Sequence, residues 1–165
     1  MLGYASAMRG SGLVALTLAD VEAKPGGIRH SKTDQEHRGQ VVAVAHGTHA
    51  ATDPIAAIAA WLMIRGDQPG ALFTRVWSSR ISDQPLGNHV VARMLRQRAV
   101  AAGLDGTRIT AHSRRAGHAT EAAGAGVPLH QIAAQTRHRD LTVVVNRYIR
   151  PLVALATTSS KDLGL

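Results

Sequence analysis

The sequence contains no cysteine and very few aromatic residues, and each shortage excludes a class of protein. Without cysteine there can be no disulfide framework and no thiolate metal site. Phe, Trp and Tyr make up only 3% of the 165 residues, whereas hydrophobic residues, many of them alanine and valine, make up 45%. A core of this composition depends on many small contacts between helices. The chain is long enough for one domain with such a core.

Acidic residues are also scarce, because 11 Asp and Glu stand against 19 Lys and Arg, for a formal net charge of +8 at pH 7. A globular chain this basic usually binds a polyanion, and nucleic acid is the first expectation. The alternative from charge alone is a merely soluble protein with an arginine-rich composition.

Long apolar runs are missing as well. No stretch approaches the length of a membrane span, and the first nine residues lack the pattern of a signal peptide. We therefore expect a soluble, cytoplasmic protein with no membrane partner.

Turn residues and β-branched residues predict a small antiparallel sheet between Asp20 and Ala45, with strands at 28–31 and 40–45 and Lys32 at its exposed hairpin. An apolar, helix-compatible stretch at 11–19 precedes it. Capping and stop signals predict helices after the sheet. We expect helices at 53–65, at 88–103 with Asn88 as the cap, from 110–113 to 124–126, at 128–136, and from Asp140 through Tyr148. Between the first two of these, we expect a mixed loop at 67–84 in which Leu72 and Phe73 point inward. The expected fold is a mostly helical α+β domain.

Three local features carry chemistry. His112 and Arg115 are three residues apart, so on a helix they share a face, where a guanidinium and an imidazole suit a phosphate. Tyr148 lies between arginines, and positive charge favours its phenolate and makes the oxygen a better nucleophile. Lys32 at a hairpin tip can reach a DNA groove or protonate a leaving oxygen. Taken singly, each also fits an ordinary surface or structural residue.

A histidine-based metal protein is a further alternative, because the chain has nine histidines and a close pair, His46 and His49. No carboxylate-rich ligand pattern surrounds that pair. We therefore expect no metal site, and a purely structural interaction module would explain none of the three features.

Taken together, the motifs resemble those of the tyrosine recombinases, the phage-integrase family. The stretch 8–16 (MRGSGLVAL) resembles the first arginine box, and 31–35 (SKTDQ) the β-hairpin lysine. The stretch 112–117 (HSRRAG) resembles the histidine-x-x-arginine box, and His138 followed by 148–150 (YIR) the last two catalytic positions. Each motif is unspecific alone, but their order is specific and covers nearly the whole chain.

The resemblance implies a tyrosine-recombinase catalytic-domain fold and a set of catalytic positions, which are Arg9, Lys32, His112, Arg115, His138 and Tyr148. In this family the tyrosine attacks a DNA phosphate, forms a 3′-phosphotyrosyl link and frees a 5′-hydroxyl, without ATP, metal or another cofactor. Arg9 and Arg115 would then bind the phosphate oxygens together with His138, while Lys32 acts as general acid. His112 would accept or shuttle the tyrosine proton.

The resemblance also implies partners. Double-stranded DNA would be held by further arginines, which are Arg93, Arg96, Arg114, Arg137 and Arg147. Family members act as homotetramers on two DNA sites. We therefore expect a site-specific recombinase or integrase that assembles on DNA.

Three departures from the family pattern keep a second interpretation open. Gly12 stands where the arginine box usually has a glutamate, and the interval from His138 to Tyr148 is one residue longer than the family pattern. Arg9 lies almost at the start, so we expect residues 1–165 to be a single catalytic domain without the usual N-terminal DNA-clamping domain. The alternative function is a non-catalytic DNA-binding remnant of a truncated integrase.

Overall fold

The computed structural model describes residues 1–24, 27–31, 41–138 and 140–149. The chain divides into two compact units, Met1–Arg115 and Ala116–Leu165. The division falls inside one helix, α5 (Ser113–Gly124). We describe each unit by itself.

The expected small antiparallel sheet is present in the first unit and has three strands. They are β1 (Val21–Lys24), β2 (Gly27–Ser31) and β3 (Val41–Ala45), in the order β1-β2-β3. The strand β1 was not among the expected ones. Val42 and Val44 of β3 are buried while their neighbours in the strand are exposed, as the two-residue period of a strand requires. One face of the sheet therefore joins the core.

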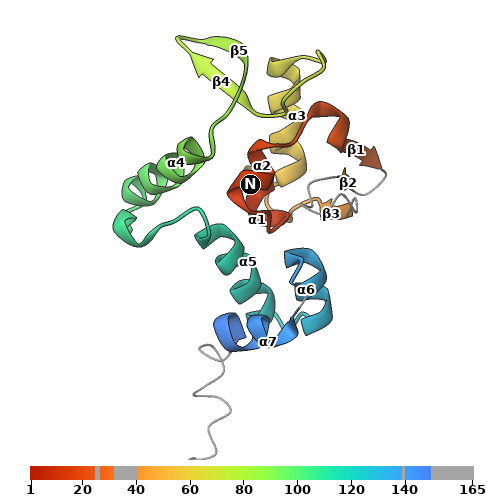
Figure 1. The fold of residues 1–165 in the computed structure, drawn as a ribbon, viewed down its shortest axis with the longest axis vertical. Coiled ribbons are helices and arrows are strands. Elements are labelled where there is room, and N and C mark those ends of the chain that lie inside the picture. The colour runs from red at the N-terminus through yellow and green to blue at the C-terminus, as the bar shows by residue number, and fades with distance from the viewer. Residues whose placement is uncertain (25–26, 32–40, 139, 150–165) are drawn as a thin grey trace, which may run out of the picture. The chain divides into compact units, whose positions relative to one another are not determined.

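The first unit also contains the helices α1 (Leu2–Ala5), α2 (Gly10–Val14), α3 (Pro54–Arg65) and α4 (Asn88–Ala101) (Figure 1). Helix α1 packs against α3, α2 against α4, and α3 against β3. Met8, Leu16 and Leu72 are among the most buried side chains of this core. The core thus lies between the N-terminal helices, α3 and the sheet.

The apolar stretch at 11–19 is helical over a shorter length than its composition predicts. Helix α2 ends at Val14, and a 3₁₀ turn follows at Leu18–Asp20. The carboxylate of Asp20 accepts hydrogen bonds from the backbone N–H and the hydroxyl of Thr17 at 2.9 and 2.7 Å. This local side-chain bonding gives the backbone an alternative to a continuous helix.

The prediction of a mixed loop over 67–84 is wrong for the second half of this segment, where a β-hairpin forms. Strands β4 (Thr74–Trp77) and β5 (Arg80–Pro85) pair antiparallel, and Trp77 lies opposite Arg80. The two turn residues, Ser78 and Ser79, have φ values of 44° and 67°. Two-residue hairpin turns usually carry Asn or Gly at such positions, so Ser-Ser gave no turn signal. Before the hairpin, Leu72 is fully buried and Phe73 packs against the core, as expected.

Two of the three expected helix caps are confirmed. The side chain of Asp53 accepts a hydrogen bond from the backbone of Ile55 at 2.8 Å, with Pro54 at the first helical position of α3. Asp140 accepts one from Thr142 at 2.7 Å. The prediction for Asn88 is wrong, because Gly87 takes the cap position of α4. The side-chain oxygen of Asn88 instead lies over Gly10.

The second unit is helical and has a small core of its own. Helix α6 (Leu129–Thr136) is followed by α7 (Leu141–Val144), which continues directly into a π-helical turn, Val145–Ile149. The buried side chains of this core are Ala119, Ile132, Ala133, Val144 and Tyr148. In the described part of the chain, no helix combines the length and apolarity that a membrane span requires.

Candidate active site

Arg115 lies in the first turn of α5 and is only 2% exposed. Its Nη1 donates a hydrogen bond to the backbone carbonyl of Ala7 at 3.2 Å. The backbone of Ala7 is left-handed, with φ of 50°, a conformation that costs a residue with a side chain about 1 kcal/mol. This backbone turn therefore aims a carbonyl at Arg115.

Arg9 follows two residues after Ala7 and occupies the cap position before α2. Its side chain is exposed, and its carbonyl accepts the hydrogen bond from Leu13 N that starts the helix. The structure therefore brings the segment that carries Arg9 against the guanidinium of Arg115. These are the two arginines that the sequence analysis assigned to the phosphate.

His112 lies just before α5 and not on it. Its carbonyl accepts a hydrogen bond from the backbone of Arg115 at 3.0 Å, and its own N–H donates to the hydroxyl of Thr110 at 3.2 Å. His112 is exposed, whereas Arg115 is buried. The hypothesis that these two side chains point the same way stays a prediction.

Tyr148 belongs to the second unit and is 4% exposed. Its ring centroid lies 5.7 Å from that of His138, with an angle of 49° between the ring planes. The last two of the sequence-predicted catalytic positions are therefore in contact.

The one-residue excess between His138 and Tyr148 coincides with the π-helical turn at Val145–Ile149. An α-helix bonds each N–H to the carbonyl four residues earlier, whereas a π-turn bonds it to the fifth and so contains one residue more. An insertion in a regular α-helix would rotate the following residues by about 100°. A π-turn can accommodate one extra residue, and the Tyr148 ring lies beside His138.

The end of α6 positions His138. Arg137 has φ of 54° and ψ of 45°, the left-handed conformation that commonly ends a helix. The chain reverses there, and the backbone N–H of His138 bonds to the carbonyl of Ala133 at 3.0 Å. The His138 Nδ1 then lies 2.7 Å from the hydroxyl oxygen of Thr136, which is fully buried.

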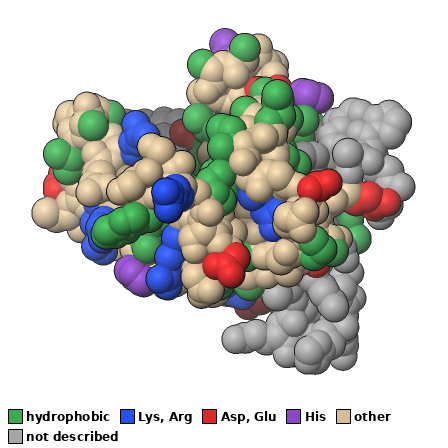
Figure 2. All heavy atoms as spheres, turned by 90° about the horizontal axis from the view of Figure 1, so that it is seen from above, with side chains coloured by type: hydrophobic (Ala, Val, Ile, Leu, Met, Phe, Trp, Pro, Cys, Tyr) green, Lys and Arg blue, Asp and Glu red, His purple; other side chains and the backbone are tan. Residues whose placement is uncertain are grey.

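The structure describes some of the remaining sequence-predicted residues and not others. Lys32 lies outside the described residues, as does the side chain of Arg147. Arg93 and Arg96 are exposed on α4, where Arg96 Nε donates to the carbonyl of Ile109 at 3.0 Å. Arg137 is partly buried at the helix end described above. Figure 2 shows one face of the molecule, on which Lys and Arg side chains lie at several places among hydrophobic and uncharged ones.

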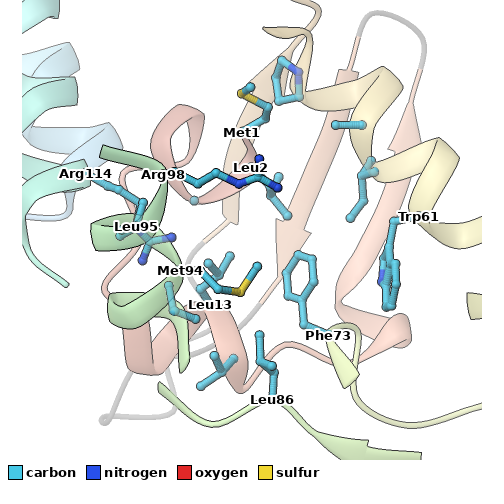
Figure 3. Close-up of a pocket in the computed structure, with 16 residues that line it drawn as sticks. Met1, Leu2, Leu13, Trp61, Phe73, Leu86, Met94, Leu95, Arg98 and Arg114 are labelled. Atoms are coloured by element: carbon cyan, nitrogen blue, oxygen red, sulfur yellow. The ribbon is translucent and has the colours of Figure 1, made fainter. Parts of the chain in front are cut away.

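Arg114 is partly exposed and lies next to Arg115 in α5. It lines an apolar cavity of about 310 Å³ in the first unit, together with Leu13, Trp61, Leu95 and Arg98 (Figure 3). Its Nε and Nη2 are buried without a hydrogen-bond partner in the described residues. Burial lowers the pKa of the Arg114 guanidinium.

His46, one of the histidines considered for a metal, is bound to a helix cap instead. Its Nδ1 lies 2.8 Å from the carboxylate of Asp53. The hydrogen bond from His46, followed by those from the backbone, lowers the pKa of Asp53 to about 2. Among residues 1–24, 27–31, 41–138 and 140–149, no three metal-binding side chains of His, Asp or Glu come together.

Two residues of the site were missed by sequence reasoning, Ala7 and Thr136. Nothing in the sequence marks Ala7, because a left-handed backbone at alanine has no compositional signal. The sequence does show a threonine two residues before His138. Its hydroxyl contacts the histidine ring only because the backbone reverses at Arg137.

Comparisons with known proteins point to one family. Residues 1–154 match the model of the phage integrase family. An integrase/recombinase xerD homolog from Selenomonas ruminantium is 34% identical over 155 residues, which cover 90% of this chain and 45% of that protein. The chain therefore spans less than half the length of this relative.

Solved structures share the fold at low sequence identity. The XerA recombinase is 18% identical with a TM-score of 0.68, over 94% of this chain and 55% of that one. The XerH site-specific recombinase bound to difH substrate is 17% identical with a TM-score of 0.71, over 94% and 43%. A Tn1549 transposon integrase in complex with circular intermediate DNA is 15% identical with a TM-score of 0.59, over 89% and 51%.

Proposed function

The chain belongs to the phage integrase family, and from that premise we propose that it cuts and rejoins DNA through a covalent bond between Tyr148 and a DNA phosphate. The Tyr148 oxygen attacks the phosphorus, and the bond from phosphorus to the 5′-oxygen breaks. The products are a 3′-phosphotyrosyl link and a free 5′-hydroxyl. Attack by the 5′-hydroxyl of another strand reverses these steps and releases Tyr148, so the bond energy is conserved.

The proton balance assigns two further roles. The tyrosine proton goes to His112, and the departing 5′-oxygen takes a proton from Lys32. Negative charge grows on the two non-bridging oxygens of the phosphate, where Arg9, Arg115 and His138 donate hydrogen bonds. Removing one such donor typically lowers the rate by about 100- to 1,000-fold.

One observation carries this proposal: the ring of Tyr148 lies against His138 although the interval between them is one residue too long. π-turns are rare in proteins and are frequently found at functional sites. Its presence at Tyr148 supports a role that depends on where this side chain lies. The hydrogen bond from Arg115 to Ala7, next to the Arg9 segment, supports the phosphate-binding role of the two arginines.

A nicked suicide DNA substrate tests the covalent step. The chain should form a DNA adduct that survives a denaturing gel, and Tyr148→Phe should remove it. Tyr4 is the only other tyrosine, and it is exposed on α1, so Tyr4→Phe is the matched control and should keep the adduct.

The same experiment distinguishes covalent catalysis from the alternative function, non-catalytic DNA binding. A non-catalytic DNA-binding remnant would bind the substrate in a salt-sensitive way and give no adduct with either variant. An adduct that persists in Tyr148→Phe would overturn the assignment of the nucleophile.

Double-stranded DNA is the proposed partner, and a homotetramer on two DNA sites the proposed assembly. The net charge of +8 supports the first, as do fold relatives that were solved on DNA. Residues 1–165 then act as a single catalytic domain, with Arg93, Arg96, Arg137 and Arg147 on the DNA backbone. A shift to a four-chain complex on two-site DNA in analytical ultracentrifugation would support the assembly, and a persistent single-chain complex would contradict it.

A further inference from the structure

Thr136 is the last residue of α6, and its hydroxyl contacts both its own helix and the candidate catalytic histidine. Its oxygen lies 2.6 Å from the carbonyl oxygen of Ile132 and 2.7 Å from Nδ1 of His138. The carbonyl of Ala133 is more distant, at 3.4 Å. With an exposed fraction of 0%, this hydroxyl is shielded from water.

The direction of these hydrogen bonds follows from the proton inventory. A hydroxyl has one proton to donate, and a carbonyl oxygen can only accept. At 2.6 Å, the oxygens of Thr136 and Ile132 would repel each other without a proton between them, so the hydroxyl donates to Ile132. Its oxygen then has only lone pairs to offer to His138. The contact at 2.7 Å therefore requires a proton on Nδ1.

The backbone holds the ring in the position where this contact forms. The left-handed Arg137 reverses the chain after α6, and the N–H of His138 bonds to Ala133 at 3.0 Å. The Tyr148 ring packs against the imidazole from α7 and its π-turn, 5.7 Å away between centroids. The helix end holds the backbone of His138, while the Thr136 hydroxyl and the Tyr148 ring contact its imidazole.

We propose that Thr136 is a positioning residue that keeps the proton of neutral His138 on Nδ1 and directs Nε2 to the reacting phosphate. The identity of the target, a DNA phosphate, rests on the proposed function, whereas the position of the proton on His138 does not. Nε2 carries the lone pair of the neutral ring. His138 therefore donates a hydrogen bond to a phosphate oxygen only after it takes a second proton, as an imidazolium.

Nitrogen NMR of the full chain, labelled at histidine, tests the proton position without any DNA. At a pH where the ring is neutral, His138 should show a protonated Nδ1 and an unprotonated Nε2. Thr136→Ser keeps the hydroxyl and should keep this pattern. Thr136→Val removes it at nearly the same shape and should move the proton toward Nε2. A wild-type proton on Nε2, or an unchanged pattern in Thr136→Val, would overturn the proposal.

Two further measurements keep a negative result informative. If Thr136→Val does not fold, the wild-type spectrum and Thr136→Ser still decide the proton position. With the nicked substrate, Thr136→Val should slow adduct formation about 10-fold or more, and Thr136→Ser should restore it. Absence of an adduct in the wild type would count against the proposed function alone, because the NMR result does not depend on it. An equal adduct rate in Thr136→Val and wild type would contradict the positioning role.

Discussion

A residue other than glycine adopts a left-handed backbone beside each half of the candidate site. Ala7 does so before Arg9, and Arg137 does so before His138. In both cases the conformation has a visible result, because the Ala7 carbonyl meets Arg115 and the reversal at Arg137 brings His138 to Thr136. Such conformations are retained where the surrounding structure requires them, often at functional sites.

Ala7→Gly relieves a steric penalty of about 1 kcal/mol, but it also removes a fully buried methyl group worth about 0.8 kcal/mol and adds the entropic cost of glycine, about 0.5–1 kcal/mol. The free energy of unfolding should therefore fall by less than about 1 kcal/mol. Urea denaturation followed by circular dichroism measures the change. The matched control is Ala56→Gly on the exposed side of α3, which should lower the free energy of unfolding by about 1 kcal/mol. A loss clearly greater than that of Ala56→Gly would show that glycine relieves no strain at this position.

Arg114 leads to a second prediction at this scale. Arg114 is partly exposed, but its Nε and Nη2 are buried without a hydrogen-bond partner in the described residues, which is unfavourable. An apolar side chain of similar length fits the cavity lining. Arg114→Met should therefore raise the free energy of unfolding by about 1 kcal/mol. Arg93→Met, on the exposed side of α4, should change it by less than about 0.5 kcal/mol. A clear loss of stability in Arg114→Met would mean that Arg114 has a partner in solution.

At the scale of elements, the π-turn makes the position of Tyr148 sensitive to chain length. Deleting Val145 removes the extra residue and should leave a regular α-helix with the tyrosine still near His138. Inserting one alanine after Val145 should rotate Tyr148 by about 100°. Adduct formation should survive the deletion and fail with the insertion, and proton contacts between the two rings in NMR should follow the same pattern. The reverse outcome would mean that the turn does not set the position of Tyr148.

The cap of α3 predicts a pH dependence of stability. The pKa of Asp53 is lowered from an ordinary value of 3.8 to about 2, first by the hydrogen bond from His46 and then by backbone N–H groups. A lowered pKa in the folded state means that the ionised cap stabilises the fold above pH 4. This contribution is lost as the pH falls through 2.

Thermal melting between pH 4 and pH 2 tests this cap. The wild-type Tm should fall across this window, and part of the fall should be absent in Asp53→Asn, which still caps the helix but does not titrate. Identical pH profiles for the two proteins would contradict this account.

The elements that sequence reasoning predicted are those with local signals. Asp53-Pro54 and Asp140 mark the starts of α3 and α7, and the β-branched run 41–45 marks β3. The hairpin at Ser78-Ser79 was missed because its turn residues are atypical. The common direction proposed for His112 and Arg115 stays a prediction, because α5 begins at Ser113, one residue after His112. A hydroxyl contact such as Thr136–His138 depends on a backbone reversal that pattern reasoning does not predict.

At the scale of the whole molecule, charge dominates the expected behaviour on DNA. Nineteen Lys and Arg against 11 acidic residues leave a net charge of +8. Binding should release counterions, so affinity for a double-stranded oligonucleotide should fall steeply, by orders of magnitude for about six phosphate contacts, between 50 and 200 mM salt. Fluorescence anisotropy measures the slope. Tyr148→Phe should leave it unchanged, because it removes no charge, whereas Arg93→Gln should reduce it by about one phosphate contact. A salt-independent affinity would contradict a phosphate-based interface.

The π-turn also bears on how related sequences should be compared. A gap opened to match relatives with a shorter interval between histidine and tyrosine would fall by default in the loop after His138. The π-turn at Val145–Ile149 lies within the last helix and can accommodate one extra residue there. Relatives with the longer interval should share the π-turn, and those with the shorter one should continue α7 as a regular helix through the tyrosine.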